Sequence, residues 1–202
     1  MGNPIKNLSQ SIPSPDLTLT RCDWVNNTDA LYITYHDQEW GKPCLDRNTL
    51  FAMLCLEGQQ AGLSWYTVLK KRAHYYTSFH HFVPEKVSGI DDEMMNELKN
   101  DPGLIRHLGK LSSIVSNAQA LLKMEAEGEN FVEFIWSFVN GKSKINHFNS
   151  IEEIPASTEE SIQLSKALKK RGFRFVGPTI CYAFMQATGL VNDHLLSCHF
   201  RE

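Results

Sequence analysis

The spacing of apolar residues constrains the fold of this 202-residue chain more than any other sequence feature. Segments with the period of an amphipathic helix follow one another along the chain, and clear alternation of apolar and polar residues, which is typical of β-strands, is missing. The longest helical segment runs from Leu104 to Met124 and places its large apolar residues on one face. The pattern therefore predicts an all-α domain of about six to eight helices.

Capping residues and glycines indicate where several helices begin and end. Asp46 or Asn48 is placed to cap a helix that continues to Leu56, and a glycine-rich turn separates the last two helical segments. The segment 131–139 is apolar on nearly every side and is expected to be buried. The remaining expected helices are Trp65–Tyr76, Asp91–Lys99, Ser161–Lys170 and Thr179–Thr188.

Length, charge and hydropathy exclude some classes of protein. A chain of 202 residues with 42% hydrophobic side chains is long enough to form one globular domain with its own core. No apolar run approaches the ~18 residues that a membrane span requires, so no membrane partner is expected. The net charge of −3 argues against a protein coated in basic charge, although it does not exclude a local basic patch.

The first 20 residues differ in composition from the rest of the chain. They are polar, contain several prolines and lack the apolar run of a signal peptide, so we expect a disordered leader at 1–20 and a single domain at 21–202. Five cysteines, an odd number in a chain without an export signal, favour reduced thiols or metal ligation over disulfides. These features indicate a cytoplasmic protein.

Two pairs of metal-ligating residue types stand near opposite ends of the expected domain. Cys22 and His36 lie in its first segment, whereas His194 and Cys198 lie in its last, spaced so that both face one side of a helical turn. Two thiolates and two imidazoles suit tetrahedral zinc, which would also fix both chain ends. Spacing alone leaves open that these are unrelated core or surface residues, because Cys22 and His36 are not closely paired.

Glu57 follows a helical run that is apolar on nearly every side. An unpaired carboxylate in a buried position costs on the order of several kcal/mol, so a glutamate buried there is either salt-bridged or kept for chemistry. The alternative is a glutamate that faces solvent at the helix end, and spacing alone does not decide between the two.

Aromatic residues are concentrated in the sequence around Glu57. Aromatic faces can sandwich a planar ring, and they attract a ring that carries positive charge. Core packing is the ordinary explanation for any one of them, but so many rings around a single carboxylate favour a ligand pocket. The rings belong to Trp24, Tyr32, Tyr35, Trp40 and Trp65.

A basic turn that contains glycine precedes the last expected helix. Every charged residue between 166 and 174 is basic, and the glycines let backbone amides approach an anion closely. The N-terminus of the following helix suits a phosphate of a nucleic-acid backbone, although a solvated helix end with a tight turn explains the same composition. The candidate phosphate-binding residues are Lys169, Lys170, Arg171, Gly172, Arg174 and Gly177.

Taken together, these blocks resemble the 3-methyladenine DNA glycosylase I family of base-excision repair enzymes. The resemblance runs from about Arg21 to Cys198, and blocks of this length in this order are highly specific. The matching text includes RCDW at 21–24, YHDQEWG at 35–41, CLEGQQAGLSW at 55–65, FVGPT at 175–179 and GLVNDH at 189–194.

The resemblance implies an all-α, helix-hairpin-helix DNA glycosylase-like bundle whose N- and C-terminal segments are tied by one structural zinc ion. A site closed by four protein ligands leaves no position for a substrate or water, so the implied metal is structural. The implied zinc ligands are Cys22, His36, His194 and Cys198.

The resemblance also implies roles for the other candidate residues. Glu57 falls at the family's base-recognising carboxylate and is the implied catalytic residue, and the basic turn falls at the DNA-binding hairpin. Leu63 is a candidate for filling the gap that a flipped base leaves. The implied base-binding residues are Tyr32, Tyr35 and Trp65, with Trp24 and Trp40 nearby.

The implied activity is monofunctional hydrolysis of the N-glycosidic bond in double-stranded DNA that contains alkylated bases. The enzyme, expected as a monomer, flips out 3-methyladenine, releases it and leaves an abasic site. One departure concerns the aspartate that many helix-hairpin-helix glycosylases carry after the hairpin. Asn192 occupies that position here, although a shift of one residue would bring Asp193 to it.

Two other classes of function compete with this interpretation. A zinc-stapled DNA-binding module that recognises damage without cutting would keep the metal ligands and the hairpin, but it would not need Glu57 in an aromatic pocket. A zinc hydrolase acting on another substrate would require an open coordination position at the metal.

Overall fold

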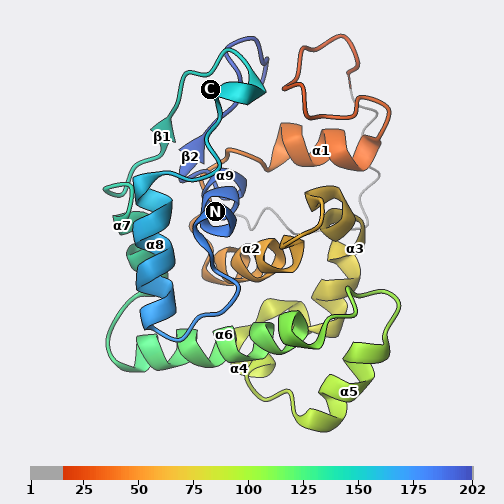
Figure 1. Ribbon diagram of the computed structural model, residues 1–202, viewed down its shortest axis with the longest axis vertical. Coiled ribbons are helices and arrows are strands. Elements are labelled where there is room, and N and C mark those ends of the chain that lie inside the picture. The colour runs from red at the N-terminus through yellow and green to blue at the C-terminus, as the bar shows by residue number, and fades with distance from the viewer. Residues whose placement is uncertain (1–15, 202) are drawn as a thin grey trace.

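The structure, a computed structural model, describes residues 16–201, and its regular elements are almost all helices (Figure 1). The expectation of a mainly α-helical domain is thereby confirmed, although the described range contains nine α-helices rather than the six to eight expected. None of the helices in this range combines the length and the apolar character that crossing a bilayer requires. The elements are α1 (Ala30–Gln38), α2 (Arg47–Gln60), α3 (Trp65–Ser78), η1 (His80–Phe82), α4 (Pro84–Val87), α5 (Asp92–Asn100), α6 (Leu108–Ala126), α7 (Phe131–Ser137), β1 (Lys144–Ile145), η2 (Ile151–Glu153), α8 (Glu159–Lys170), α9 (Pro178–Ala187) and β2 (Val191–Asn192).

Helix α2 lies at the centre of the molecule because it is apolar nearly all round (Figure 1). All residues from Leu50 to Gln59 are buried, and the helix packs against α3, α6, α7 and α9. Asp46 is the cap, since its Oδ1 accepts a hydrogen bond from the backbone N–H of Thr49 at 2.9 Å. The buried stretch includes Glu57, so the carboxylate lies inside the protein rather than at a solvated helix end.

Two helices in the described range, α1 and α4, have no counterpart among the helices that periodicity predicted. The inner face of α1 buries His36 and Asp37 beside Ile33 and Tyr35, and these polar residues obscure the apolar period. Helix α4 spans only four residues, too few to show a period. Helix α6 begins at residue 108 rather than 104, because His107 caps it.

The two ends of the described chain meet. The backbone N–H of His199 donates to the carbonyl of Thr20 at 2.9 Å, so residues 16–20 contact the domain. Strand β2 pairs in parallel with β1, which fixes the chain just before His194. Gly189 allows the close approach of these segments, since a Cβ there would lie 2.2 Å from the carbonyl carbon of Lys42. The rest of the expected leader, 1–15, lies outside the described residues, so the domain boundary stays a prediction.

The link between α3 and α4 contains an unusual left-handed turn. His80, His81 and Phe82 have φ values of 50°, 55° and 53°, which L-residues rarely adopt. Such a conformation costs roughly 1–2 kcal/mol per residue relative to the right-handed one. Phe79 and Phe82 are fully buried and hold the turn in place.

Replacing His81 by glycine is expected to raise the free energy of unfolding by roughly 0.5–1 kcal/mol, because relief of the strained φ exceeds the added entropy of the unfolded chain. The side chain of His81 is exposed, so little packing is lost. Denaturant unfolding measures the change. His81→Ala is the matched control, since it removes the imidazole and keeps Cβ. The explanation fails if the glycine variant is no more stable than the alanine variant.

Candidate active site and metal centre

Glu57 lies in the last turns of α2 with only 2% of its surface exposed. Its Oε2 atom is buried and has no hydrogen-bond partner among the described residues. Burial raises the pKa of Glu57 to about 8, and no cationic side chain within the described part of the chain offsets this effect. A cationic or hydrogen-bond-donating ligand beside the carboxyl would favour its ionised form, which makes Glu57 a natural partner for a positively charged group.

Aromatic rings from α1 and α3 face this carboxylate. The pKa values of the Tyr32 and Tyr35 hydroxyls are raised by burial and, next, by the negative charge of Glu57, which places both rings near it. Trp65, the first residue of α3, lies with its ring centroid 5.3 Å from that of Tyr35. The Trp65 Nε1 atom is also buried without a partner among the described residues. These residues, the candidate base pocket, therefore offer aromatic rings, one acceptor and one donor, and neither of the last two has a partner among the described residues.

Trp24 and Trp40, the other two candidate base-binding tryptophans, lie farther along the same aromatic cluster, toward the candidate metal ligands. The Trp24 ring is 5.1 Å from that of Tyr32 and 5.2 Å from that of His36, so it bridges the two sites. The Trp40 ring is 4.7 Å from the ring of His194 and packs on the metal side. The base-binding roles assigned to Trp24 and Trp40 stay predictions.

Two ion-pair and hydrogen-bond clamps that the sequence analysis did not anticipate support the pocket. Arg72 forms a bidentate pair with Glu39 at 2.5 and 2.7 Å, and its guanidinium lies 5.9 Å from the centre of the Tyr35 ring. Tyr66 donates to Asp29, which also caps α1. Helical periodicity assigns Arg72 to a solvated face, and no local pattern indicates a partner that lies on another helix.

Lys110 of α6 fixes the turn that connects Glu57 to Trp65. Its buried Nζ donates to the carbonyls of Gln59 at 2.9 Å and Ala61 at 2.6 Å, at the end of α2. Leu63 lies at the outer side of this turn, 43% exposed, as expected of a residue that would enter a DNA helix. A buried lysine at this place is invisible in the sequence, because α6 is otherwise a regular amphipathic helix.

The four candidate metal ligands come together from both ends of the chain. The ligand atoms of Cys22, His36, His194 and Cys198 all lie within 4.8 Å of one another, and all four residues are buried. The thiol–imidazole distances are 3.5, 3.5 and 3.3 Å. Bond lengths of about 2.3 Å to sulfur and about 2.05 Å to nitrogen in a tetrahedron place these atoms about 3.5 Å apart, so the set has the dimensions of a zinc site.

Neighbouring groups hold both imidazoles in the orientation that ligation needs. His36 Nδ1 lies 2.7 Å from Asp37, which in turn pairs bidentately with Arg21, so Nε2 faces the thiols. His194 Nε2 lies 3.1 Å from the carbonyl of Trp40, so Nδ1 faces them. Such outer contacts fix the tautomer and orientation of metal-bound histidines.

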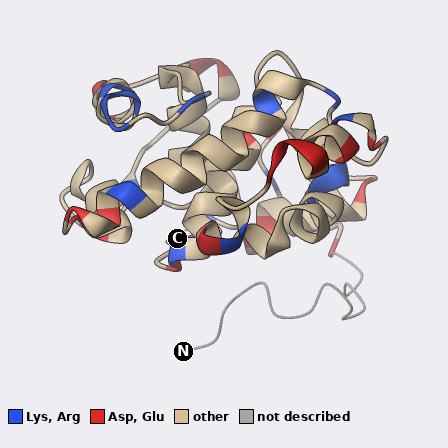
Figure 2. Cartoon of the chain, turned by 90° about the horizontal axis from the view of Figure 1, so that it is seen from below, with Lys and Arg blue, Asp and Glu red and all other residues tan. Residues whose placement is uncertain are grey.

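The basic turn lies between α8 and α9. Figure 2 shows basic residues at the end of α8, seen nearly along its axis, and acidic residues gathered at the start of α5. Arg174 is exposed at the tip of the turn. Gly177 is the N-cap of α9 and makes no side-chain capping bond. Pro178, the first residue of the helix, has no N–H, so the backbone N–H groups of Thr179 and Ile180 are the ones available to an anion.

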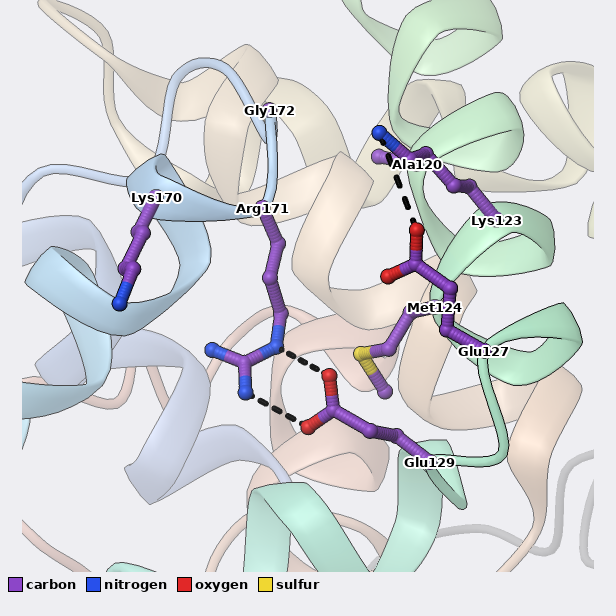
Figure 3. Close-up of a pocket in the computed structure, with 8 residues that line it drawn as sticks. All are labelled: Ala120, Lys123, Met124, Glu127, Glu129, Lys170, Arg171 and Gly172. Carbon is purple, nitrogen blue, oxygen red and sulfur yellow. Dashed lines mark hydrogen bonds and ion pairs between the residues drawn. The ribbon is translucent and has the colours of Figure 1, made fainter.

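Arg171 has a different position from the other basic residues of this turn. Its guanidinium donates to Glu129 at 3.0 and 2.6 Å and lies 4.3 Å from the centre of the Phe134 ring. Figure 3 shows its side chain directed at Glu129, across a cavity of about 470 Å³ between α6 and the end of α8. Arg171 therefore ties the turn to the helices beside it instead of extending into solvent.

Asp193 does not have the surroundings of a free catalytic carboxylate. It is fully buried and accepts hydrogen bonds from Tyr182 at 2.6 Å, Gln186 at 2.8 Å and Asn146 at 2.7 Å. The Asn192 side chain accepts from the backbone N–H of His194 at 3.1 Å. Both residues thus support the segment that carries His194.

Comparison with known proteins gives consistent matches. A family model described as methyladenine glycosylase matches residues 24–202. The chain is 57% identical over 180 residues to DNA-3-methyladenine glycosylase 1 of Escherichia coli (strain K12), covering 89% of this chain and 96% of that protein. A crystal structure of 3-methyladenine DNA glycosylase I aligns with a TM-score of 0.87 at 56% identity, over 89% of this chain and 98% of that chain. A tyrosine-to-phenylalanine variant of a 3-methyladenine DNA glycosylase I, in complex with 3-methyladenine, aligns with a TM-score of 0.83 at 40% identity, over 86% and 94%.

We compare the free energy of unfolding of Glu57→Gln with that of the native protein. The difference between them is expected to grow in favour of the variant as the pH rises from about 4.5 to about 8. Between these values the unfolded chain has lost the Glu57 proton and the folded chain keeps it, so the free energy of unfolding of the native protein falls with rising pH. Glutamine does not titrate. Thermal unfolding at several pH values measures the difference in Tm.

Glu97→Gln is the matched control, because Glu97 is exposed on α5 and its removal leaves the buried carboxyl in place. A Tm difference for Glu57→Gln that is the same throughout this pH range would contradict the assignment of a neutral, buried carboxyl.

Proposed function

The chain belongs to the methyladenine glycosylase family, and we propose that it is a base-excision repair enzyme that releases 3-methyladenine from alkylated double-stranded DNA. The observation that carries the proposal is the buried Oε2 of Glu57, which has no partner among the described residues and lies near the ring of Tyr35, against which Trp65 packs. Methylation at N3 gives adenine a positive charge. A desolvated carboxyl between aromatic rings suits a flat cation that donates hydrogen bonds.

The reacting base must leave the duplex before it can enter this pocket. Flipping costs a few kcal/mol and is cheaper for a damaged base than for an intact pair. In the pocket, Trp65 and Tyr35 stack on the base and Glu57 accepts its hydrogen bonds. Neutral adenine lacks the positive charge that the ring faces and the carboxylate attract, so we expect selectivity to come from charge as well as shape.

The charge on the base also explains how the bond breaks without a strong general acid. Water adds to the anomeric carbon, the electron pair of the N-glycosidic bond moves to the base, and the base leaves as neutral 3-methyladenine. The water loses one proton, and an abasic site remains. Lys110, beneath the pocket turn, is held by two carbonyls and is not placed to attack the sugar, which supports hydrolysis without a lyase step.

We assign DNA backbone contacts to the turn between α8 and α9 and the gap-filling role to Leu63. The exposed tip, the uncapped start of α9 and the basic end of α8 support this assignment. Arg171 is assigned a role in holding the turn, because Glu129 occupies its guanidinium. The remaining proposed DNA-binding residues are Lys169, Lys170, Gly172, Arg174 and Gly177.

We further propose one structural zinc ion at the four clustered ligands, in a cytoplasmic monomer. When bound, zinc would cross-link the first and last segments of the domain through two thiolates and two imidazoles. Four protein donors leave no open position, which argues against a zinc hydrolase. A damage-binding module without activity is disfavoured because it does not need the unpartnered carboxyl of Glu57.

Replacing Glu57 by glutamine is expected to weaken binding of free 3-methyladenine by roughly 10- to 100-fold, because a charge-assisted hydrogen bond contributes about 1.5–3 kcal/mol. Binding of adenine, which lacks the methyl group, should change much less. Isothermal titration calorimetry measures both ligands, and single-turnover base release measures the effect on catalysis. Glu97→Gln serves again as the control. Unchanged binding and unchanged release in the Glu57 variant would remove this residue from base recognition.

Replacing Trp65 by alanine is expected to cost about 1–3 kcal/mol of binding free energy for 3-methyladenine if the base stacks on this ring. The same calorimetric titration measures this loss. A fall in base release without any loss of base binding would count against stacking.

Removal of zinc is expected to lower the Tm, because a ligand that binds only the folded chain stabilises it. Elemental analysis should find about one zinc per chain, and Cys198→Ser should reduce both the zinc content and the Tm. Cys44→Ser is the matched control, since Cys44 lies outside the cluster. A purified protein that contains no zinc and whose Tm is insensitive to a chelator would contradict the proposal.

A further inference from the structure

The turn between α8 and α9 rests directly on the helix that carries Glu57. Phe175, in this turn, has a left-handed backbone with φ 55°. Its Cβ and carbonyl oxygen lie so close to α2 that a Cβ on Gly58 would be 3.2 Å from each. Its ring packs edge-on against His107, the cap of α6, with centroids 6.2 Å apart.

The local backbone does not require glycine at position 58. It lies inside α2, where alanine is favoured over glycine by about 1 kcal/mol, and its backbone is not left-handed. Among the described residues, and apart from its chain neighbours and the backbone of α2 itself, the atoms within 4 Å of its missing Cβ are those of Phe175. The residue next to the proposed base-recognising carboxyl is therefore small because the turn lies against it.

A second contact fixes the same turn from α6. The fully buried side chain of Asn117 donates to the carbonyl of Arg174 at 3.1 Å and accepts from its backbone N–H at 2.8 Å. Ser165 of α8 donates to the carbonyl of Val176 at 2.6 Å. The backbone of the turn is thus held on both sides of Phe175, which leaves it little freedom to move relative to α2.

We infer that Gly58, Phe175 and Asn117 are positioning residues that fix the distance between the DNA-holding turn and the base pocket. The inference rests on the proposed function, in which the turn grips the DNA backbone and Glu57 receives the flipped base. A flipped nucleotide stays tethered to the gripped backbone, so it reaches Glu57 only if these two parts keep their spacing. Free 3-methyladenine has no tether, and its binding does not depend on this spacing.

The test compares the free base with the base in DNA. Gly58→Ala should lower kcat/KM on duplex DNA containing 3-methyladenine by roughly 3- to 10-fold, because the added Cβ displaces the turn by a few tenths of an ångström and a displacement of about 1 Å costs about 100-fold. The Kd for free 3-methyladenine, measured by calorimetry, should stay unchanged. Gly89→Ala is the matched control, because a Cβ there meets only ordinary contacts. Equal losses in both measurements, or no loss in either, would overturn the inference.

A double variant tests the specific contact. Phe175→Gly removes the Cβ that Gly58→Ala would strike and suits the left-handed backbone. The carbonyl oxygen of Phe175 stays in place, and Phe175→Gly alone lowers activity by removing the ring contact with His107. The loss of activity on duplex DNA in the double variant should therefore be smaller than the product of the two single losses. A double variant whose loss equals that product would overturn the inference.

If Gly58→Ala does not fold, Asn117→Ala tests the position of the same turn, because it removes both hydrogen bonds to the backbone of Arg174. Loss of activity on duplex DNA with an unchanged Kd for free 3-methyladenine supports the inference, and parallel loss of both contradicts it. The proposed function is tested separately by the unmodified protein. If that protein releases no 3-methyladenine from DNA, the proposed function itself fails, whatever the variants do.

Discussion

The arrangement of this protein depends on the burial of one carboxyl group in an apolar helix. Helix α2 is buried along almost its whole length, and Oε2 of Glu57 has no hydrogen-bond partner in residues 16–201. An unpaired buried carboxyl destabilises the fold and is kept neutral by its surroundings, which raise its pKa to about 8. A cationic ligand that pairs with this carboxyl would offset the cost of burying it. The rings of Tyr35 and Trp65, which pack together, would contact such a ligand.

The other parts of the site are arranged around the same helix. Lys110 holds its C-terminal end and the turn to Trp65, and the DNA-facing turn lies against Gly58. The clustered cysteines and histidines join the first and last segments beside the aromatic cluster, with Trp24 between the metal ligands and the pocket. The residues proposed for base recognition, for DNA contact and for closure of the chain ends thus meet within a few helices. On this proposal a small basic surface is sufficient, because selectivity comes from the residues around Glu57.

The sequence predicted the parts of this structure that follow from local patterns, and missed those that depend on distant partners. The apolar run of α2 indicated its burial, but only the structure decides that Glu57 lies inside. Spacing alone was weak evidence for a metal site. The family resemblance identified the four residues that the fold brings together. Helix α1 was missed because it buries His36 and Asp37. The pairing of Arg171 with Glu129 and of Arg72 with Glu39 joins residues far apart in the chain, which no periodicity reveals.

The central claim is that the pocket around Glu57 extracts a cationic methylated base from DNA and leaves an abasic site. The most direct measurement is to incubate the protein with duplex DNA treated with a methylating agent, chromatograph the released bases and examine the strands. The account predicts free 3-methyladenine and DNA strands that stay intact until alkali cleaves them at abasic sites. An absence of released 3-methyladenine would contradict it.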